Sequence, residues 1–198
     1  MIGIIDYGMG NLRSVEKAFQ FLGFNAQVSE NISFIEKADK IVLPGVGAFE
    51  DAITTIKNKG FDKIIKEQVN KGKPFLGICL GMHMLFDISY ENGKFKGLGL
   101  IPGIVKKLNN NVKIPHIGWN NLKLYKKDPL FKDLSENPYV YFVHSYHIET
   151  DPSVVSATTF YGQEIQVAVQ KDNIYATQFH PEKSGDIGLQ ILKNFSLL

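Results

Sequence analysis

The sequence predicts an α/β fold: a mainly parallel mixed sheet flanked by helices, with an antiparallel strand extension. Short continuous apolar runs, such as Ile2 to Ile5, are typical of strands buried on both faces. Segments with apolar residues at helical spacing alternate with these runs in the first half, which indicates parallel strands joined by helices. After Tyr139 the apolar runs follow one another with only short turns, which favours antiparallel pairing.

Composition is that of a globular protein, and we expect one domain over residues 1–198. Apolar residues make up 44% and charged residues 21% of the chain, and the net charge of +2 gives no overall case for nucleic-acid binding. The pairs Lys106-Lys107 and Lys126-Lys127 are typical of a solvated surface. The single cysteine excludes an internal disulfide and suits a reducing compartment. Without a signal-peptide pattern or an apolar run long enough to span a membrane, we expect a cytoplasmic protein.

The first elements form a β–loop–α–β unit. The strand Ile2–Ile5 leads into a loop with two glycines, and Asn11 suits the N-cap of the helix that follows. That helix is predicted from apolar residues at Leu12, Val15, Phe19 and Leu22, and Gly23 fits its end. Strands are expected over Ala26–Ser29 and Lys40–Leu43. The glycine loop lacks the full dinucleotide fingerprint, so we reject a nucleotide-cofactor site there.

The centre of the chain carries a candidate nucleophile. Pro74 to Ile78 predicts a buried strand, Cys79 follows it directly, and helix-compatible residues come next. Gly77-Ile78-Cys79-Leu80-Gly81 is the thiol form of the nucleophile elbow, in which glycines leave room for a sharp strand-to-helix turn. A helix starting after Cys79 would favour the thiolate, and the N–H of Leu80 would be placed to donate to an oxyanion. A lone cysteine in an apolar run is usually only a small buried side chain, but its position between two glycines favours the nucleophile.

His180 is the candidate base for this nucleophile. It lies in Gln178-Phe179-His180-Pro181-Glu182, after the strand-like run Ile174 to Thr177. We expect His180 and Glu182, two apart in an extended segment, to point the same way, so that the carboxylate orients the imidazole. A surface turn without chemistry is the alternative, and it is less favoured because the elbow is also present.

The remaining segments complete the sheet. Apolar residues at Phe61, Ile64, Ile65 and Val69 predict a helix, whereas Glu91 to Asn110 consists mostly of loops around a short strand at Ile104-Val105. Pro115 to Asn120 is either a binding surface or a packed turn. Strands are expected over Tyr139–Val143, Val154–Phe160, Ile165–Lys171 and Ile174–Gln178, and a closing helix over Ile187, Ile191 and Phe195. His144 and His147 are expected to point to opposite faces, which disfavours a shared metal.

Together these motifs resemble class I (triad) glutamine amidotransferases, a flavodoxin-like family. The GICLG elbow with HPE carries that resemblance. A closer similarity, to the glutaminase subunits of imidazole glycerol phosphate synthases, rests on segments spread in order over nearly the whole chain: DYGMGN, PGVGAF, PHIGWN, YFVHSYH and HPEKSG.

The resemblance implies a glutaminase with a Cys79–His180–Glu182 triad and no cofactor or metal. It implies a second oxyanion donor in the loop of Gly45, Val46 and Gly47, whose peptide is misoriented until a partner binds. It also implies that the backbone of Ser145 and Tyr146 holds the substrate head group. The implied partner is a cyclase subunit that receives ammonia through a channel in a heterodimer, and the implied interface residues are Asn11, Trp119, Asn120 and Lys183.

One position departs from the family pattern. His83 stands where the family usually has a glutamine that helps to hold the amino-acid end of the substrate. Histidine offers a different hydrogen-bond geometry and a titratable charge. His83 therefore supports an alternative, a sister amidotransferase that supplies ammonia to another synthase, such as a sugar-amidating enzyme. A thiol peptidase would leave PGVGAF and PHIGWN without a role, and the intact triad disfavours an inactive interaction subunit.

Overall fold

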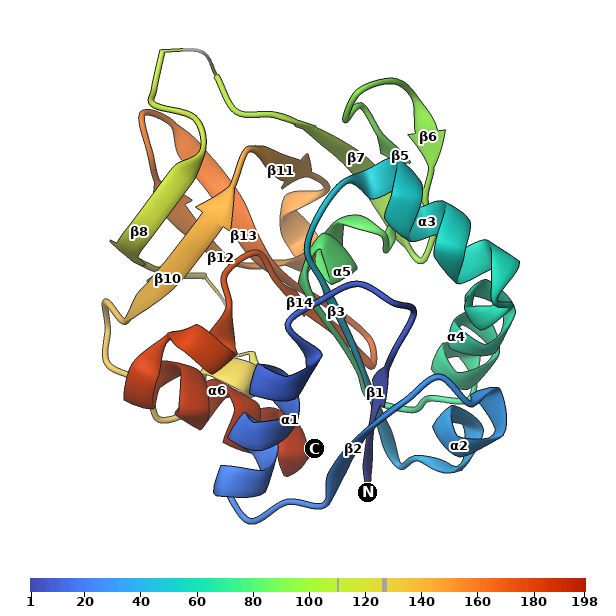
Figure 1. Ribbon diagram of the computed structural model, residues 1–198. Coiled ribbons are helices and arrows are strands. Elements are labelled where there is room, and N and C mark those ends of the chain that lie inside the picture. Colours follow the sequence, from blue (N-terminus) through green and yellow to red (C-terminus); the bar gives the residue numbers. More distant parts are fainter. Residues whose placement is uncertain (110, 126–127) are drawn as a thin grey trace.

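The computed structural model describes residues 1–109, 111–125 and 128–198, so Lys126 and Lys127 lie outside the described residues. Twelve strands of these residues form one mixed sheet (Figure 1). Ten strands follow one another across it, in the order β2 (Ala26–Ser29), β1 (Ile2–Ile5), β3 (Lys40–Gly45), β4 (Phe75–Cys79), β14 (Ile174–Thr177), β13 (Glu164–Lys171), β11 (Tyr146–Glu149), β7 (Ile101–Lys107), β5 (Phe86–Ser89) and β6 (Phe95–Lys96). β12 (Val155–Phe160) pairs with β13 and with β9 (Lys123–Leu124).

The predicted division between parallel and antiparallel strands is confirmed. β2, β1, β3, β4 and β14 pair in parallel, whereas β13 is antiparallel to β14, β11 and β12. β14 therefore closes the parallel half and opens the antiparallel half. Because β4 and β14 are parallel neighbours, the residues that follow each strand come out at the same edge of the sheet.

Helices cover both faces of the parallel half (Figure 1). α1 (Leu12–Phe21) and α6 (Gly185–Ser196) lie on one face, and α2 (Ile32–Lys37), α3 (Phe49–Asn58) and α4 (Phe61–Asn70) lie on the other. Alternation along β3 supplies both cores: Ile41 and Leu43 pack with α3 and α4, and Val42 packs with α1 and α6. The predicted helix stripes are buried, with Phe61 and Ile65 in the first core and Phe19 and Phe195 in the second.

A second sheet of two antiparallel strands, β8 (His116–Asn121) and β10 (Tyr139–His144), packs beside the antiparallel half. The Pro115–Asn120 motif, predicted to be either a binding surface or a packed turn, is not a turn, because His116 to Asn120 belong to β8. Short 3₁₀ turns complete the chain at η1 (Pro129–Phe131), η2 (Pro152–Val154) and η3 (Pro181–Lys183). No described helix is both long and apolar enough to cross a membrane.

The helix predicted directly after Cys79 is confirmed as α5 (Leu80–His83), although it is a single turn and its dipole is correspondingly small. Two other predictions of local structure differ from the structure. The stretch expected to be mostly loops contains β6 and all of the seven-residue β7, because pairing with β5 and β11 fixes a weakly patterned segment. Asn11 precedes α1, but its side chain makes no capping bond to the backbone and instead accepts a hydrogen bond from the Ser14 hydroxyl (2.8 Å).

Candidate active site

Cys79 occupies a strained backbone position at the end of β4. Its φ of 54° and ψ of −110° lie outside the regions that non-glycine residues favour, as in a nucleophile elbow. The two glycines of the motif allow this turn through close approach. A Cβ on Gly81 would lie 1.8 Å from the Leu43 carbonyl oxygen, and one on Gly77 would lie 2.9 Å from the Gly81 carbonyl oxygen. The steric reason for the predicted elbow is thus confirmed.

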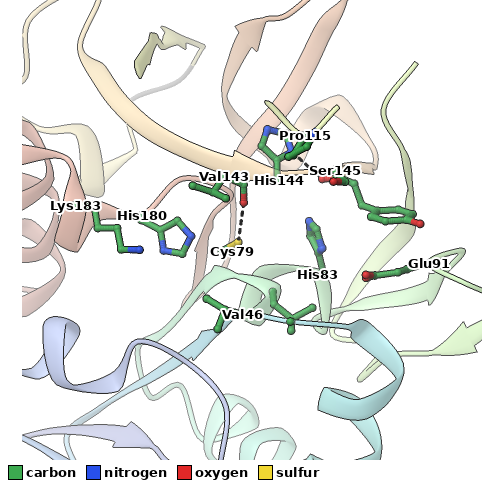
Figure 2. A pocket seen from close by; sticks show the side chains of 13 residues that line it. Val46, Cys79, His83, Glu91, Pro115, Val143, His144, Ser145, His180 and Lys183 are labelled. Carbon is green, nitrogen blue, oxygen red and sulfur yellow. Dashed lines mark hydrogen bonds between the residues drawn. The ribbon is translucent and has the colours of Figure 1, made fainter. Parts of the chain in front are cut away.

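The elbow opens into a cavity of about 350 Å³. Figure 2 shows the sulfur of Cys79 between His180 on one side and His83 on the other. Most of the lining comes from the ends of strands and the loops that follow them: Val46, Gly47, Cys79, Leu80, His83, Glu91, Pro115, Val143, His144, Ser145, Tyr146, His180 and Lys183. The cavity therefore brings together every catalytic and substrate-binding residue predicted from the sequence except Glu182, which lies behind His180, and Gly45.

His180 is held against a carboxylate. Its Nδ1 lies 2.9 Å from Oε1 of Glu182, and the two side chains are only 4% and 1% exposed. The contact was predicted, but its geometry was not: Glu182 lies in the 3₁₀ turn η3 rather than in an extended segment. Ser184 stabilises this turn, because its hydroxyl donates to the His180 carbonyl (2.7 Å) and accepts from the Tyr141 N–H (3.0 Å).

The charges around His180 favour its protonated form. Burial alone would lower the pKa of His180, but its contacts with Cys79 and Glu182 raise that pKa to about 10. Such an imidazolium stabilises an adjacent thiolate and can also donate a proton to a leaving group.

Two residues that we did not predict contact the sulfur of Cys79. The thiol donates to the Val143 carbonyl at a sulfur–oxygen distance of 3.9 Å (Figure 2), and the side-chain amide of Gln178 approaches the sulfur to 3.7 Å. Gln178 lies two residues before His180. The period-two alternation of an extended chain places such a pair on the same side, and this pattern could have identified Gln178.

His83 is buried, and it does not carry the charge that we expected from the sequence. Its Nε2 lies 2.6 Å from Oε1 of Gln178. Burial lowers the pKa of His83 to about 4, although the hydrogen bond to Gln178 partly opposes this effect. His83 is therefore neutral at physiological pH, and the charge that we expected there is absent.

The loop after β3 lies beside the elbow, as expected. Gly47 has a φ of 104°, which favours glycine, and the Val46 side chain is 41% exposed at the cavity mouth. A Cβ on Gly45 would lie 2.6 Å from the Tyr7 hydroxyl and 2.9 Å from Cβ of Leu80. Only glycine thus allows β3 to approach the elbow so closely.

Ser145 and Tyr146 form the opposite wall, and a pair of histidines supports them. Nδ1 of His144 donates to the Tyr146 carbonyl (2.8 Å), so its Nε2 accepts from Nδ1 of His116 (2.9 Å). His116 is itself stacked between Phe142 and Tyr161. This arrangement links the PHIGWN motif to the cavity wall. His147 makes a separate contact with the Ile148 carbonyl.

The predicted interface residues have different surroundings. Trp119 is 55% exposed on β8 and Lys183 lines the cavity, so both are accessible from outside. Asn120 is engaged within the chain: its amide donates to the Phe160 carbonyl (3.0 Å) and its carbonyl accepts from the Asn121 N–H (2.9 Å). Asn11 accepts a hydrogen bond from Ser14, as described above.

The chain matches the family Glutamine amidotransferase class-I over residues 3–197. It belongs to the class-I glutamine amidotransferase family. Among relatives, the chain is 51% identical over 196 residues to the "Imidazole glycerol phosphate synthase subunit HisH" of Caldanaerobacter subterraneus subsp. tengcongensis, covering 98% of this chain and 97% of that protein. It is 48% identical to the protein of the same name from Oceanobacillus iheyensis, over 98% of each chain.

Solved structures confirm the fold. A glutamine amidotransferase crystal structure superposes with a TM-score of 0.76 at 20% identity, over 98% of both chains. The structure of PurLQS from Thermotoga maritima gives a TM-score of 0.78 at 17% identity, over 99% of this chain and 97% of that one. The mixed α/β sheet is thus the fold of the family, and the chain is a glutamine amidotransferase with the cysteine nucleophile typical of that class.

Proposed function

We propose that this amidotransferase hydrolyses L-glutamine to glutamate and ammonia as the glutaminase subunit of an imidazole glycerol phosphate synthase. The observation that carries the proposal is the cavity in which the Cys79 sulfur lies beside the buried His180–Glu182 pair. Near-full-length similarity to proteins named as HisH subunits supports the choice of synthase. We also infer that residues 1–198 act as one domain, since the shared sheet joins both halves of the chain.

The first half of the reaction forms a thioester. The Cys79 thiolate attacks the side-chain amide carbon of glutamine, and the carbonyl electrons move to oxygen. We assign the resulting oxyanion to the N–H of Leu80 and to an N–H of the Gly45–Gly47 loop, where one such donor contributes about 3–4 kcal/mol to the barrier reduction. When the intermediate collapses, the C–N bond breaks, and the nitrogen takes a proton from the His180 imidazolium and leaves as ammonia.

The second half releases glutamate. Neutral His180, oriented by Glu182, removes a proton from water, and the oxygen attacks the thioester carbon. The C–S bond then breaks, which restores the thiolate and the imidazolium. In this assignment the backbone of Ser145 and Tyr146 and the side chain of His83 hold the amino-acid end of glutamine. No step requires a metal or an organic cofactor.

A partner subunit would consume the ammonia before it escapes. We propose that the cyclase subunit docks over the cavity mouth in a heterodimer with an ammonia channel, using Asn11, Trp119, Asn120 and Lys183. An exposed apolar face beside the cavity supports this placement, since β8 and β10 present Ile117, Trp119, Tyr139 and Val143 to solvent. A cytoplasmic location and a role in histidine biosynthesis follow from the same proposal.

One alternative has a specific observation in its favour. His83 in place of the family glutamine is compatible with a sister subunit that supplies ammonia to a different synthase, such as a sugar-amidating enzyme. The near-half identity to HisH subunits over the whole chain favours the first proposal.

The test is glutamate release from glutamine by the purified chain, alone and with a cyclase subunit plus its nucleotide ligand. We expect low activity alone, strong stimulation by the complex, and complete loss in Cys79→Ala. Activity that the cyclase never stimulates would favour the sister subunit. If glutamate is released in no pairing, the glutaminase proposal fails.

A further inference from the structure

A second buried pair lies beside the sulfur of Cys79, and its histidine, His83, lies on the other side of the sulfur from His180 (Figure 2). Gln178 is fully buried and His83 is 5% exposed. The Gln178 amide nitrogen lies 3.7 Å from the Cys79 sulfur, and its carbonyl oxygen lies 2.6 Å from Nε2 of His83. The proposed reaction gives Gln178 no role. Yet Gln178 bonds His83 as Glu182 bonds His180, and both histidines lie beside the nucleophile.

The chemistry of the two groups fixes the direction of this chain of bonds. A glutamine carbonyl oxygen only accepts, so His83 must carry its proton on Nε2 and donate it. The NH₂ group of Gln178 is then directed at the sulfur. The reverse orientation would present the carbonyl oxygen to the sulfur, and an oxygen acceptor can bond a thiol but repels a thiolate.

We propose that Gln178, held by His83, is a positioning residue that stabilises the Cys79 thiolate alongside His180. This inference deepens the proposed function and rests on Cys79 as its nucleophile. His83 locks the amide in the orientation that donates to sulfur, and the amide N–H gives the anion a hydrogen bond that the thiol does not need. The residue that departs from the family pattern thus acts on the nucleophile as well as lining the cavity.

The surroundings hold Gln178 in place. Its backbone N–H donates to the Val167 carbonyl at 2.8 Å, where the chain leaves β14. His83 follows Cys79 by one helical turn of α5, so it is anchored to the elbow. Gln178 follows β14, the parallel neighbour of β4, so it is anchored to the adjacent strand end. Because burial keeps His83 neutral, replacing it removes a hydrogen-bond donor and no charge near neutral pH.

Other titratable groups lie around the cavity and near the sulfur, and the Gln178 variants leave them unchanged. Tyr7 comes from the loop after β1, His180 from the residue before η3, Lys183 from η3, His144 from β10, and Glu91 from the loop after β5. Glu182 lies behind His180, and His147 lowers the pKa of His83. Because these groups are the same in the parent and in the Gln178 variants, a difference in titration between the two proteins reports on the Gln178 amide.

Cys79 is the only cysteine of the chain, so alkylation of the full-length protein by iodoacetamide reports on this thiol alone. The rate as a function of pH gives the apparent pKa of the thiol. We expect Gln178→Met to raise that pKa by about one unit, which means about tenfold less thiolate at lower pH. His83→Leu should raise it by a smaller amount, because the amide stays but loses its fixed orientation.

Two further variants separate this role from simple packing. His83→Gln keeps an N–H donor for the Gln178 carbonyl, so it should titrate within a few tenths of a unit of the parent. His147→Gln is the matched control, because it removes a neighbouring buried histidine that has no bond to Gln178, and it should also leave the thiol pKa unchanged.

Gln178→Glu guards against a loss of folding, because it keeps the shape of the side chain while replacing the amide donor with an acceptor. It should raise the thiol pKa at least as much as Gln178→Met. If both Gln178 variants titrate like the parent, the inference is overturned. The thiol titration needs no substrate, so a parent with a Gln178-dependent thiol but no glutaminase activity would refute the proposed function and leave this inference standing.

Discussion

The two histidines beside Cys79 are both buried, yet their surroundings drive their charges in opposite directions. The pKa of His180 is raised to about 10, whereas that of His83 is lowered to about 4. Each ring has one short side-chain partner: His180 bonds the Glu182 carboxylate at 2.9 Å, and His83 bonds the Gln178 amide at 2.6 Å. Burial disfavours the imidazolium at both places, so the neighbouring groups decide the outcome: Cys79 and Glu182 beside His180, and Gln178 beside His83.

The difference shows how one thiol can be supported by two unlike groups. Cys79 and the Glu182 carboxylate together keep His180 protonated, which suits it to proton transfer. The amide adds no charge, so His83 stays neutral and serves only as a hydrogen-bond donor. The comparison therefore predicts that substitutions around His180 have the largest effect on the rate of glutamate release. Substitutions around His83 should instead change the free energy of unfolding and the pKa of the thiol.

Glu182→Gln should have the largest effect, because it makes the partner of His180 resemble that of His83. Loss of the orienting carboxylate in a nucleophile–histidine–carboxylate triad costs about 10⁴-fold in rate, and we expect a comparable fall in glutamate release. The pKa of His180 should fall, so the high-pH limb of the rate profile, expected near pH 10 in the parent, should move to lower pH.

The matched control for that experiment is Asp186→Asn, which removes an exposed carboxylate from the start of α6. It should leave both the rate and the position of the limb in place. A Glu182→Gln variant within tenfold of the parent would contradict the proton-transfer role of His180.

The lowered pKa of His83 should make the free energy of unfolding fall with falling pH, whereas the raised pKa of His180 acts in the opposite direction. Because its pKa is lowered on folding, the unfolded chain binds more protons between pH 6.5 and pH 4, and the free energy of unfolding falls as the pH falls through that window. The full shift corresponds to about 3 kcal/mol. His83→Gln should remove this part of the dependence, as measured by denaturant unfolding at pH 7 and pH 4.

The pKa values of His116 and His144 are also lowered by burial, to about 4 and about 3. Their contributions are common to the parent and the variant, so the difference between the two proteins reports on His83. Identical pH dependence in the two proteins would show that His83 is not kept neutral by folding.

Tyr7→Phe should have the smallest effect and tests a third side of the thiol. The Tyr7 side chain is 1% exposed, and its hydroxyl has no hydrogen-bond partner among the described residues. Burial and the nearby Cys79 raise its pKa, so the phenol stays neutral. Removing an unpaired buried hydroxyl should increase the free energy of unfolding by about 1 kcal/mol and leave Cys79 alkylation unchanged. Lost stability or a raised thiol pKa would instead show that Tyr7 donates to the sulfur.

Much of the fold could be predicted from local pattern. The apolar runs at β1, β3 and β4 identify strands buried on both faces, and the stripes of α1, α4 and α6 identify their packing faces. α2 was missed because its six residues are too few to show a helical period. β8 was missed because its strand character depends on pairing with β10.

The candidate site divides in the same way. Cys79 and its glycines are a contiguous motif, and a motif of this kind carries its own backbone geometry. The contact between His180 and Glu182 was predicted correctly from their spacing, but the predicted backbone conformation was wrong. A 3₁₀ turn, rather than an extended segment, brings the two side chains together. The contact between Gln178 and His83 joins residues 95 positions apart, and no spacing rule predicts such a pair.

The chemical groups, the elbow and the family could all be identified from residue identity over a few neighbouring positions. Which histidine is charged and which is neutral could be assigned only from the folded chain. A pKa depends on burial and on partners brought from distant strands, and these exist only after the parallel neighbours β4 and β14 place their ends at one edge of the sheet.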